Sequence, residues 1–490
     1  MRSRLALGLA VVLAACSSGG SSSSPPVPSL PWGSFRHDNT NAAASGTVDR
    51  NTGTVTFLTS LSAGVTLSTP TIDQDNNIIV GTANGLTSVD PEGNLRWTFD
   101  QCELPGMAPV PVGSVSAAPT VTPGNTIVFG SDSTNGQPGT LFTIHQDGND
   151  VTCTWYVRPA DAGPTFSISS SAPTLIDTVS GDLSLLTAYA AGSDGRLVAL
   201  NSDGSVRWSF PAGEPSGPIT STPAVNANNT IFLATPDGLL SAINYAGRLS
   251  WQVGIGVPPA AALQPSPAVG TSIYAIGSGG SLFAYNPNGT RKWVYTPQSP
   301  VSGSPVFLAQ NFNQQSANVF DTIVYVVDVN GTAYGVRDLD GTVVQVQRCT
   351  NDPSQDCRTD SCLPNGGVCN SSNNRCSVSG KTCTQNSCLP DNGDCLVTPG
   401  IVDVAGMPAE PSASPIISTD LFVVLGTSDG RVCARALDNF TPGQNLTPST
   451  AGWVAGCINV GNGSPIRSSP IIGKNSTIYV TTDSGLYVIK

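Results

Sequence analysis

The sequence contains few charged residues, two histidines and hardly any glutamate. Charged residues make up 11% of the 490 residues, against roughly 25% in an ordinary soluble domain. Glutamate occurs at four positions and lysine is as scarce, which disfavours coiled coils and helical bundles because both residues are strong helix formers. The net charge of −12 disfavours a nucleic-acid partner, because phosphate backbones repel acidic proteins. With His37 and His145 far apart in the sequence, no histidine metal site or histidine-based catalysis is expected.

Glycine and proline are abundant instead. The chain has 52 glycines and 39 prolines, together with many Ser, Thr and Asp residues, and this composition is typical of short strands joined by tight turns. Hydrophobic residues make up 39%, which is enough to build a core. The composition therefore predicts an all-β fold.

The first 31 residues predict an export signal and a tether. Two arginines precede an apolar run over residues 5–13, which is too short to span a bilayer as a mature helix. The run ends in Leu-Ala-Ala-Cys at Cys16 and resembles a bacterial lipobox, so we expect residues 1–15 to be a lipoprotein signal peptide and Cys16 to be lipidated. An ordinary secretory signal with a chance cysteine is the alternative. The composition of residues 16–31 predicts a flexible Ser/Gly/Pro tether. A serine after the lipidated cysteine, here Ser17, resembles the signal that sorts lipoproteins to the outer membrane, so we expect the protein to face the periplasm or the cell surface from that membrane.

A motif of a small residue, proline, any residue and an aliphatic residue recurs eight times. Its prolines are Pro70, Pro119, Pro173, Pro223, Pro267, Pro305, Pro415 and Pro470. After each motif come two β-rich runs with glycine turns and then a short strand, most often with tryptophan. Asp-Gly and Asn-Gly pairs at the turns are strong hairpin signals. Eight repeats of four short strands predict an eight-bladed β-propeller.

The fourth strand of most repeats carries an aromatic residue that we expect to pack between blades. It is tryptophan in six repeats: Trp97, Trp155, Trp208, Trp251, Trp293 and Trp453. In the sixth repeat, Gln345 aligns with this place. The eighth repeat ends at Lys490, after its third strand. Residues 53–57 match the pattern of residues 93–97, so we expect an N-terminal strand to close the last blade and protect its edge.

These repeats resemble the PQQ-binding-like β-propeller family, which includes quinoprotein alcohol dehydrogenases and the lipoprotein of the outer-membrane β-barrel assembly machine. Residues 32–38, Trp-Gly-Ser-Phe-Arg-His-Asp, are similar to the W-x-x-F-R-x-D opening common in the family. The resemblance covers about residues 32–348 and 412–490 and implies the propeller fold. Its quinoprotein branch implies PQQ over an adjacent cysteine pair, a calcium ion and a catalytic aspartate. This sequence has no adjacent cysteine pair, so no catalytic residue is carried over.

Twelve cysteines remain besides Cys16, an even number that indicates disulfides in an exported chain. Eight fall into two units with intervening gaps of 7-4-6 and 6-4-6 residues: Cys349, Cys357, Cys362 and Cys369, then Cys376, Cys383, Cys388 and Cys395. Zinc is the alternative, but this segment has no histidine and no C-x-x-C pair. The pairing of these eight cysteines stays open. If each unit forms disulfides only within itself, fewer pairings are possible.

The other four cysteines suggest two bridges. Cys433 and Cys457 fall in neighbouring strands of the seventh repeat, which favours a bond between them. By elimination, Cys102 would pair with Cys153 between blades one and two.

The predicted organisation has three parts after the tether. Residues 32–348 hold the closing strand and blades one to six, residues 349–395 form a disulfide-rich insertion between blades six and seven, and residues 396–490 hold blades seven and eight. Turns between second and third strands share a face with the blade-to-blade connections in such propellers, and this face is the expected binding surface. Its candidate rim residues are Asn84, Asp132, Asp194, Asp237, Asn330, Asp429 and Asp483. We expect the insertion to crown this rim.

The functional expectation is a lipid-anchored, non-enzymatic scaffold that binds another envelope or surface protein, with outer-membrane assembly as one task. No cofactor and no metal are expected. Asp73, Asp75 and Asn77 have the spacing of the start of a calcium loop but lack its glycine and terminal glutamate. A PQQ- and calcium-dependent dehydrogenase and a surface adhesin or glycan-binding protein are the alternatives.

Overall fold

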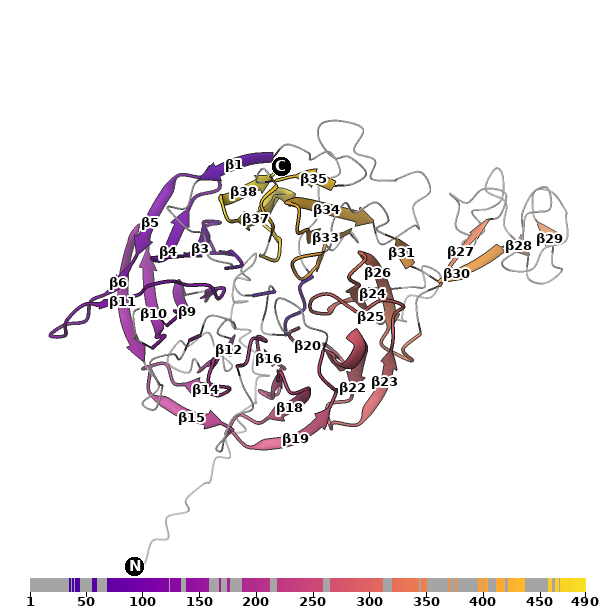
Figure 1. Ribbon diagram of the computed structural model, residues 1–490, viewed down its shortest axis with the longest axis horizontal. Coiled ribbons are helices and arrows are strands. Elements are labelled where there is room, and N and C mark those ends of the chain that lie inside the picture. The colour runs from indigo at the N-terminus through magenta and orange to yellow at the C-terminus, as the bar shows by residue number, and fades with distance from the viewer. Residues whose placement is uncertain are drawn as a thin grey trace, which may run out of the picture.

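The structure is a computed structural model, and strands dominate the part of the chain that it describes. That part comprises residues 35–36, 38, 40–44, 55–59, 68–122, 124–133, 138–157, 167–168, 174–176, 187–211, 218–258, 265–311, 320–342, 345–349, 369–370, 375–376, 395–399, 401–403, 411–418, 422–436, 457–460, 463–466 and 468–490. Eight four-stranded antiparallel sheets surround a central axis as blades (Figure 1). The predicted eight-bladed propeller is confirmed.

The blades follow one another along the chain, and within most of them the strands run in order from the centre outwards. The first four blades contain β2 (Thr71–Ile72), β3 (Ile78–Thr82), β4 (Gly85–Val89) and β5 (Leu95–Phe99); β8 (Thr120–Val121), β9 (Thr126–Gly130), β10 (Leu141–Asp147) and β11 (Asp150–Val157); β12 (Thr174–Ile176), β13 (Thr187–Ala191), β14 (Leu197–Leu200) and β15 (Val206–Phe210); and β16 (Ala224–Val225), β17 (Ile231–Ala234), β18 (Leu239–Ile243) and β19 (Leu249–Gly254).

The last four blades include two with strands from distant parts of the sequence. They contain β20 (Ala268–Val269), β21 (Ile273–Ile276), β22 (Leu282–Tyr285) and β23 (Arg291–Tyr295); β24 (Val306–Asn311), β25 (Phe320–Val327), β26 (Thr332–Arg337) and β31 (Ile401–Asp403); β32 (Ile416–Ile417), β33 (Phe422–Gly426), β34 (Arg431–Ala436) and β35 (Cys457–Asn459); and β36 (Ile471–Ile472), β37 (Ile478–Thr482), β38 (Gly485–Ile489) and β1 (Val55–Thr59). Two short 3₁₀ helices, η2 (Ser278–Gly280) and η6 (Lys474–Ser476), lie in turns.

The N-terminal strand β1 closes the ring. It pairs antiparallel with β38, the last strand of the chain, and sets Val55 opposite Ile489 and Phe57 opposite Tyr487. The eighth blade is therefore assembled from β1 and the three C-terminal strands, and β1 and β38 lie together at the top of Figure 1. The prediction of a closing strand around residues 53–57 is confirmed.

Blade six differs from the prediction. Its outer strand is β31, and Ile401 pairs opposite Tyr334 of β26. Gln345, predicted for that outer strand, lies instead in β27 (Gln345–Cys349), which pairs with β30 (Cys395–Pro399). The insertion therefore leaves and returns between the third and fourth strands of blade six, and its predicted place between blades six and seven is wrong. The glycine turn at residue 341 resembles that of other repeats, but no tryptophan follows it to mark an outer strand.

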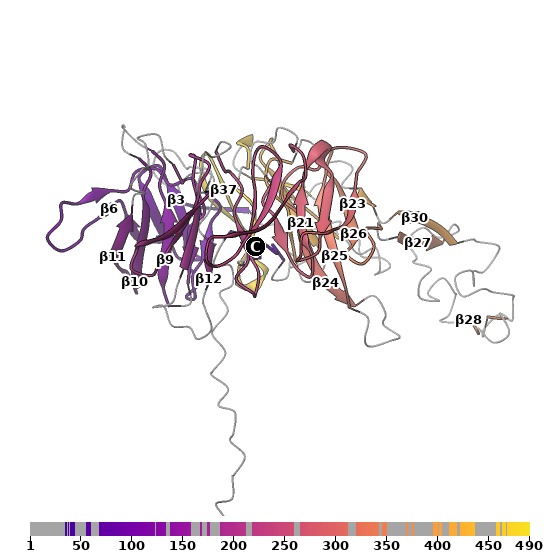
Figure 2. The ribbon, with the colours of Figure 1, turned by 90° about the horizontal axis from the view of Figure 1, so that it is seen from below.

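The described strands of the insertion lie beside the ring. The pair β27–β30 and the small pair β28 (Cys369–Asn370) and β29 (Arg375–Cys376) project outwards from blade six in both views (Figures 1 and 2). The expectation that the insertion crowns the central rim is therefore wrong for these strands. Cys357, Cys362, Cys383 and Cys388 lie outside the described residues, as do Cys16, His37 and Trp453.

Tryptophans of the outer strands connect neighbouring blades. Trp293 Nε1 of blade five donates to the carbonyl oxygen of Asp338 in blade six at 2.8 Å. Gly341 lies under the indole ring with a φ of +73°, and a Cβ there would come within 2.7 Å of the ring. Trp155, Trp208 and Trp251 make the same bond to the carbonyls of Ser202, Tyr245 and Pro287. In blades three to six, an N/D-x-x-G turn thus receives the tryptophan of the preceding blade, whereas Trp97 Nε1 of blade one is buried without a hydrogen-bond partner.

The serine of the repeated proline motif also connects neighbouring blades. The backbone N–H of Thr222 donates to Ser266 Oγ at 2.9 Å, that of Ser266 to Ser304 Oγ at 2.9 Å, and that of Ser304 to Ser414 Oγ at 3.1 Å. All four residues precede innermost strands. A small hydroxyl residue before the proline therefore links the inner edges of blades four to seven.

Two disulfides predicted from the sequence are present. Cys433 in β34 and Cys457 in β35 are direct register partners and are bonded. Cys102 is bonded to Cys153 of β11, which joins blade two to the segment that follows blade one.

Candidate functional site

One face of the propeller gathers the turns between second and third strands and the connections between blades. The backbone N–H of Asp132, in such a turn, donates to the carbonyl of Ser114 in the connection between blades one and two. Ile255, in the connection between blades four and five, donates likewise to Gly238. We call this surface the connection face, and it matches the face predicted to bind ligands.

The seven predicted rim residues all lie in these turns but differ in exposure. Asn84, Asp237, Asn330 and Asp483 are exposed, whereas Asp132, Asp194 and Asp429 are half-buried.

The half-buried carboxylates support the connection face itself. Ser114 Oγ and Ser116 Oγ donate to the two oxygens of Asp132 at 2.7 and 2.8 Å. Asp429 accepts from Thr427 Oγ1 at 2.6 Å and pairs with Arg431 at 3.3 Å. These two carboxylates brace turns and connections, so only part of the predicted rim is free to meet a ligand.

Asp194 is the rim residue with a shifted titration. Burial raises the pKa of Asp194, opposed by a hydrogen bond from the backbone of Arg196. Its carboxylate lies 3.9 Å from the Arg196 side chain, and both are about 30% exposed. Such a loose, partly solvated pair contributes little to stability.

A segment before the closing strand lies against the innermost strands. Asn41 Nδ2 donates to the carbonyls of Thr222, Pro223 and Pro267, the last at 2.9 Å. The backbone N–H of Ile417 in β32 donates to the Ala43 carbonyl at 2.9 Å. We call residues 40–44 with Arg36 the channel segment, because these bonds reach the inner edges of blades four, five, six and seven.

Arg36 fixes the channel segment to blade six. Its guanidinium donates to the carbonyl of Pro305 at 2.5 Å and to that of Asn41 at 3.4 Å. The residue is completely buried, and burial lowers its pKa to about 9, with Asp38 acting in the opposite direction. Its bonds to the carbonyls of Pro305 and Asn41 offset part of the cost of burying the charge.

The channel segment bears on the cofactor that the fold family suggests. A quinone held at the axis against blades four to seven would displace Asn41, whose amide already occupies three inner-edge carbonyls. The sequence also has no adjacent cysteine pair. The residues present therefore do not fit PQQ at this place.

The possible calcium loop is a structural hairpin. Asp73 Oδ1 accepts from the backbone N–H groups of Asp75 and Asn77, and Oδ2 accepts from the side chains of Asn77 and Gln146 at 2.9 and 3.0 Å. N–H donors surround this carboxylate, which is the opposite of what a cation requires. No group of three or more His, Cys, Asp or Glu residues that could hold a metal occurs within the described ranges. His145 is exposed on β10.

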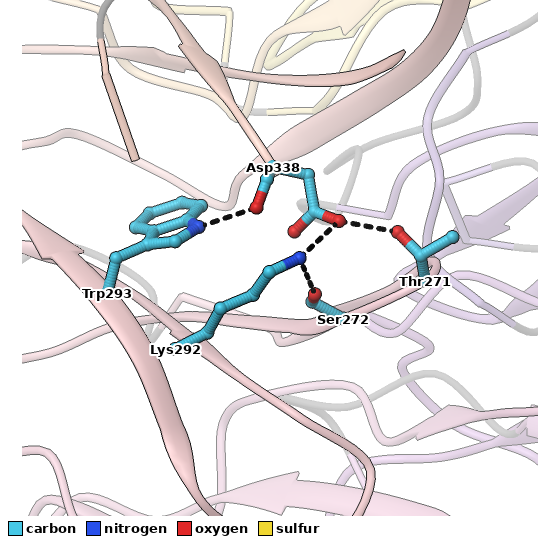
Figure 3. A network of polar contacts seen from close by, with 5 residues as sticks. All are labelled: Thr271, Ser272, Lys292, Trp293 and Asp338. Carbon is cyan, nitrogen blue, oxygen red and sulfur yellow. Dashed lines mark hydrogen bonds and ion pairs between the residues drawn. The ribbon is translucent and has the colours of Figure 1, made fainter. Parts of the chain in front are cut away.

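A partly buried polar network lies between blades five and six (Figure 3). Asp338 Oδ2 accepts from Lys292 Nζ at 2.9 Å and from Thr271 Oγ1 at 2.7 Å. Lys292 also reaches Ser272 Oγ at 3.3 Å. The side chain of Asp338 is 7% exposed and that of Lys292 is 26% exposed, so this partly buried pair joins the two blades.

Replacement of Asp338 by Asn is expected to lower stability at pH 7 by about 1–3 kcal/mol, because Lys292 loses its charged partner. Burial alone would raise the pKa of Asp338, but hydrogen bonds from Thr271, Ser272 and Lys292 bring it below the ordinary 3.8. As the pH falls, the unfolded chain therefore takes up the proton first. The stabilisation is complete above pH 3.8 and is lost as the pH falls through the folded-state pKa. Urea unfolding of both proteins should give free energies that converge as the pH falls below 3.8, and a gap that is constant across acid pH would contradict this.

A hairpin projects from the outside of the ring. β6 (Gln101–Cys102) and β7 (Val110–Pro111) pair antiparallel, and they extend beyond the blades in both ribbon views (Figures 1 and 2). Its base is fixed by the Cys102–Cys153 disulfide, and its tip carries Met107, which is 59% exposed. We call residues 101–111 the finger.

The finger lies in the connection between blades one and two, and the sequence placed such connections on the expected binding face, whereas the channel segment was not among the sequence candidates. The odd density of proline and apolar residues over residues 104–111 is a signal for the finger. The opening motif contains Arg36 but gave no hint that it reaches the centre. Among the described residues, no helix is long and apolar enough to span a membrane.

Comparisons with known proteins agree with the fold. A family model described as "Outer membrane protein assembly factor BamB" matches residues 160–369. No curated protein matches the chain in sequence. Among solved structures, quinohemoprotein alcohol dehydrogenase ADHIIG from Pseudomonas putida HK5 is 12% identical, with 93% of this chain and 76% of that chain covered and a TM-score of 0.51. BamB from Moraxella catarrhalis is 13% identical over 89% of this chain and 97% of that chain, with a TM-score of 0.48.

At this identity the likeness to ADHIIG bears on the fold alone. Residues 160–369 match the repeats of the family model, and the eight four-stranded blades have the β-propeller fold that such repeats imply.

Proposed function

We propose that the chain is a lipid-anchored, non-enzymatic propeller that binds another protein of the cell envelope. The observation that carries this proposal is the channel segment, because the chain itself occupies inner-edge carbonyls of blades four to six that an axial ligand would use. A propeller bound to its own N-terminal segment in this way offers its outer surfaces for recognition. Lipidation at Cys16 would hold those surfaces close to the membrane.

The matching family description supports the setting. It names an outer membrane protein assembly factor, and assistance to outer-membrane proteins is the task we favour. Such a task requires rigid surfaces for protein contacts and no reacting groups.

The finger is the contact element that we favour. Its disulfide and three prolines, Pro105, Pro109 and Pro111, hold the tip in place before binding, which lowers the entropic cost of association. The prolines lack N–H groups, so the hairpin edge is poorly suited to adding a partner strand. Recognition would instead insert Met107, an adaptable apolar side chain, into a socket of the partner.

The charges near the finger indicate the partner's chemistry. Asp100 and Glu103 precede the tip, and no lysine or arginine occurs over residues 97–157. Anionic lipid headgroups would repel this sequence, whereas membrane-inserting tips carry aromatic and basic residues. The partner is therefore a protein with an apolar socket edged by basic side chains.

Met107→Asp is expected to weaken partner binding about 10- to 30-fold, as for loss of a buried apolar anchor. The melting temperature should stay unchanged, because Met107 is exposed. The measurement has two steps. A photo-crosslinking amino acid at position 107 of the full chain in living cells first yields the partner, and binding of the purified pair is then titrated.

Leu339 provides the matched control. It is 66% exposed, in a turn of blade six remote from the finger, so crosslinking from position 339 and the Leu339→Asp variant should leave the partner's yield and affinity unaffected. Equal crosslinking from both positions, or unchanged affinity of Met107→Asp, would refute the finger as the contact. A crosslink to lipid alone would refute a protein partner.

A further inference from the structure

The insertion brings its first and last cysteines together, and its two middle cysteines together. In the β27–β30 ladder, Cys349 is the register partner of Cys395. In the β28–β29 ladder, Cys369 is the register partner of Cys376. Each pair joins one of the two sequence units to the other.

Blade seven contains a disulfide between two cysteines that are register partners in the same way. Cys433 and Cys457 are register partners in antiparallel strands, with their Cα atoms 4.0 Å apart, and they form a disulfide. Directly opposed residues in an antiparallel ladder have Cα atoms about 4.5–5.5 Å apart, which is within the span of a disulfide. The same register is therefore a sufficient backbone arrangement for the two pairs in the insertion.

We propose that Cys349 is bonded to Cys395 and Cys369 to Cys376, as two nested cross-links. The insertion is then one loop that is cross-linked at its base and near its middle, and a pairing in which each four-cysteine unit is bonded only within itself is excluded. In each step two thiols lose two protons and two electrons as the S–S bond forms, while the disulfide of an exported thiol–disulfide oxidoreductase accepts them and becomes a dithiol.

The outer cross-link has a clear position in the fold. It lies where the chain leaves blade six after β26 and returns to it as β31. A cross-link at the base of the insertion fixes the distance between the points where the chain leaves and re-enters the blade. The position of β31 in blade six therefore does not depend on the conformation of the rest of the insertion. The insertion can thus interrupt a blade without opening it.

Peptide mapping of the alkylated, non-reduced full chain tests the proposal. Cleavage before aspartate places Cys349 in residues 340–351 and Cys395 in residues 394–402, and these fragments should be linked. Trypsin places Cys376 in residues 376–381, which should be linked to residues 359–375. The bonded pair Cys433 and Cys457 serves as the internal positive control.

Single serine variants give a second readout that does not depend on the digest. Cys349→Ser should free one thiol, at Cys395, and Cys369→Ser should free one, at Cys376. A link between fragments 340–351 and 356–359, a free thiol at any of the four cysteines in the unmodified chain, or release of a different cysteine in either variant would overturn the proposal.

Discussion

Deletion of residues 52–61 is expected to cost about 4 kcal/mol of unfolding free energy and to lower the melting temperature by roughly 5–10 °C. The deletion removes β1, which has four register partners in β38, and a net backbone hydrogen bond contributes about 1 kcal/mol. It also leaves the edge of β38 unpaired at the point where the ring closes. An exposed strand edge of this kind templates association, so the shortened protein should aggregate on heating. Thermal unfolding followed by circular dichroism, with light scattering, measures both effects.

A deletion of equal length in the tether is the matched control. Removing residues 18–27 takes out ten residues of Ser, Gly, Pro and Val that belong to no predicted strand, and the melting temperature should stay within about 1 °C of the parent. A closing-strand deletion that melts like the tether deletion would show that β1 contributes nothing to closure.

The closing strand could be predicted because the segments of a repeat protein can be aligned with one another. Residues 53–57 carry the same Gly-x-x-x-aromatic pattern as other outer strands, and the last repeat lacks one. The outer strand of blade six could not be found in the same way, since 63 residues (338–400) separate β31 from β26 and β31 is only Ile-Val-Asp. A three-residue strand without tryptophan carries no signal that separates it from a loop.

The disulfides also divide into one that local sequence could predict and others that it could not. Cys433 and Cys457 fall in consecutive strands of one blade, so local strand order was enough to pair them. The pairing inside the insertion needs the register of β27 with β30, which depends on strands far apart in sequence with no repeat to align them.

The channel segment marks the limit of prediction for the candidate site. Asn41 bonds to carbonyls about 180 and 225 residues away, and such contacts follow from closing the ring rather than from any local pattern. The turns that hold the candidate rim residues could be assigned to one face because they repeat with the blades. The serines that donate to Asp132 come from the connection between blades one and two, which is not part of the repeat. The sequence therefore could not predict that this carboxylate has a structural role.

Trp293→Ala is expected to lower the unfolding free energy by about 3–5 kcal/mol, the range for buried tryptophan. Trp293 is 8% exposed, packs over Gly341, and donates to the carbonyl of Asp338 at 2.8 Å. Loss of the indole leaves a cavity between blades five and six beside the Asp338–Lys292 pair, and the carbonyl loses its donor. Trp293→Phe keeps most of the packing and should cost about 1–2 kcal/mol. Equilibrium urea unfolding gives both values.

The repeat supplies the control within the same chain. Trp251 makes the equivalent bond to Pro287 at 2.9 Å but is only half-buried, so Trp251→Ala should cost clearly less than Trp293→Ala because less apolar surface leaves a dry environment. Equal losses at both positions would mean that the hydrogen bond, which the two share, determines the contribution of the tryptophan. A Trp293→Ala protein as stable as its parent would instead show that the tryptophan–glycine contact does not help to hold the blades together, and would remove the physical reason for the N/D-x-x-G turns of blades three to six.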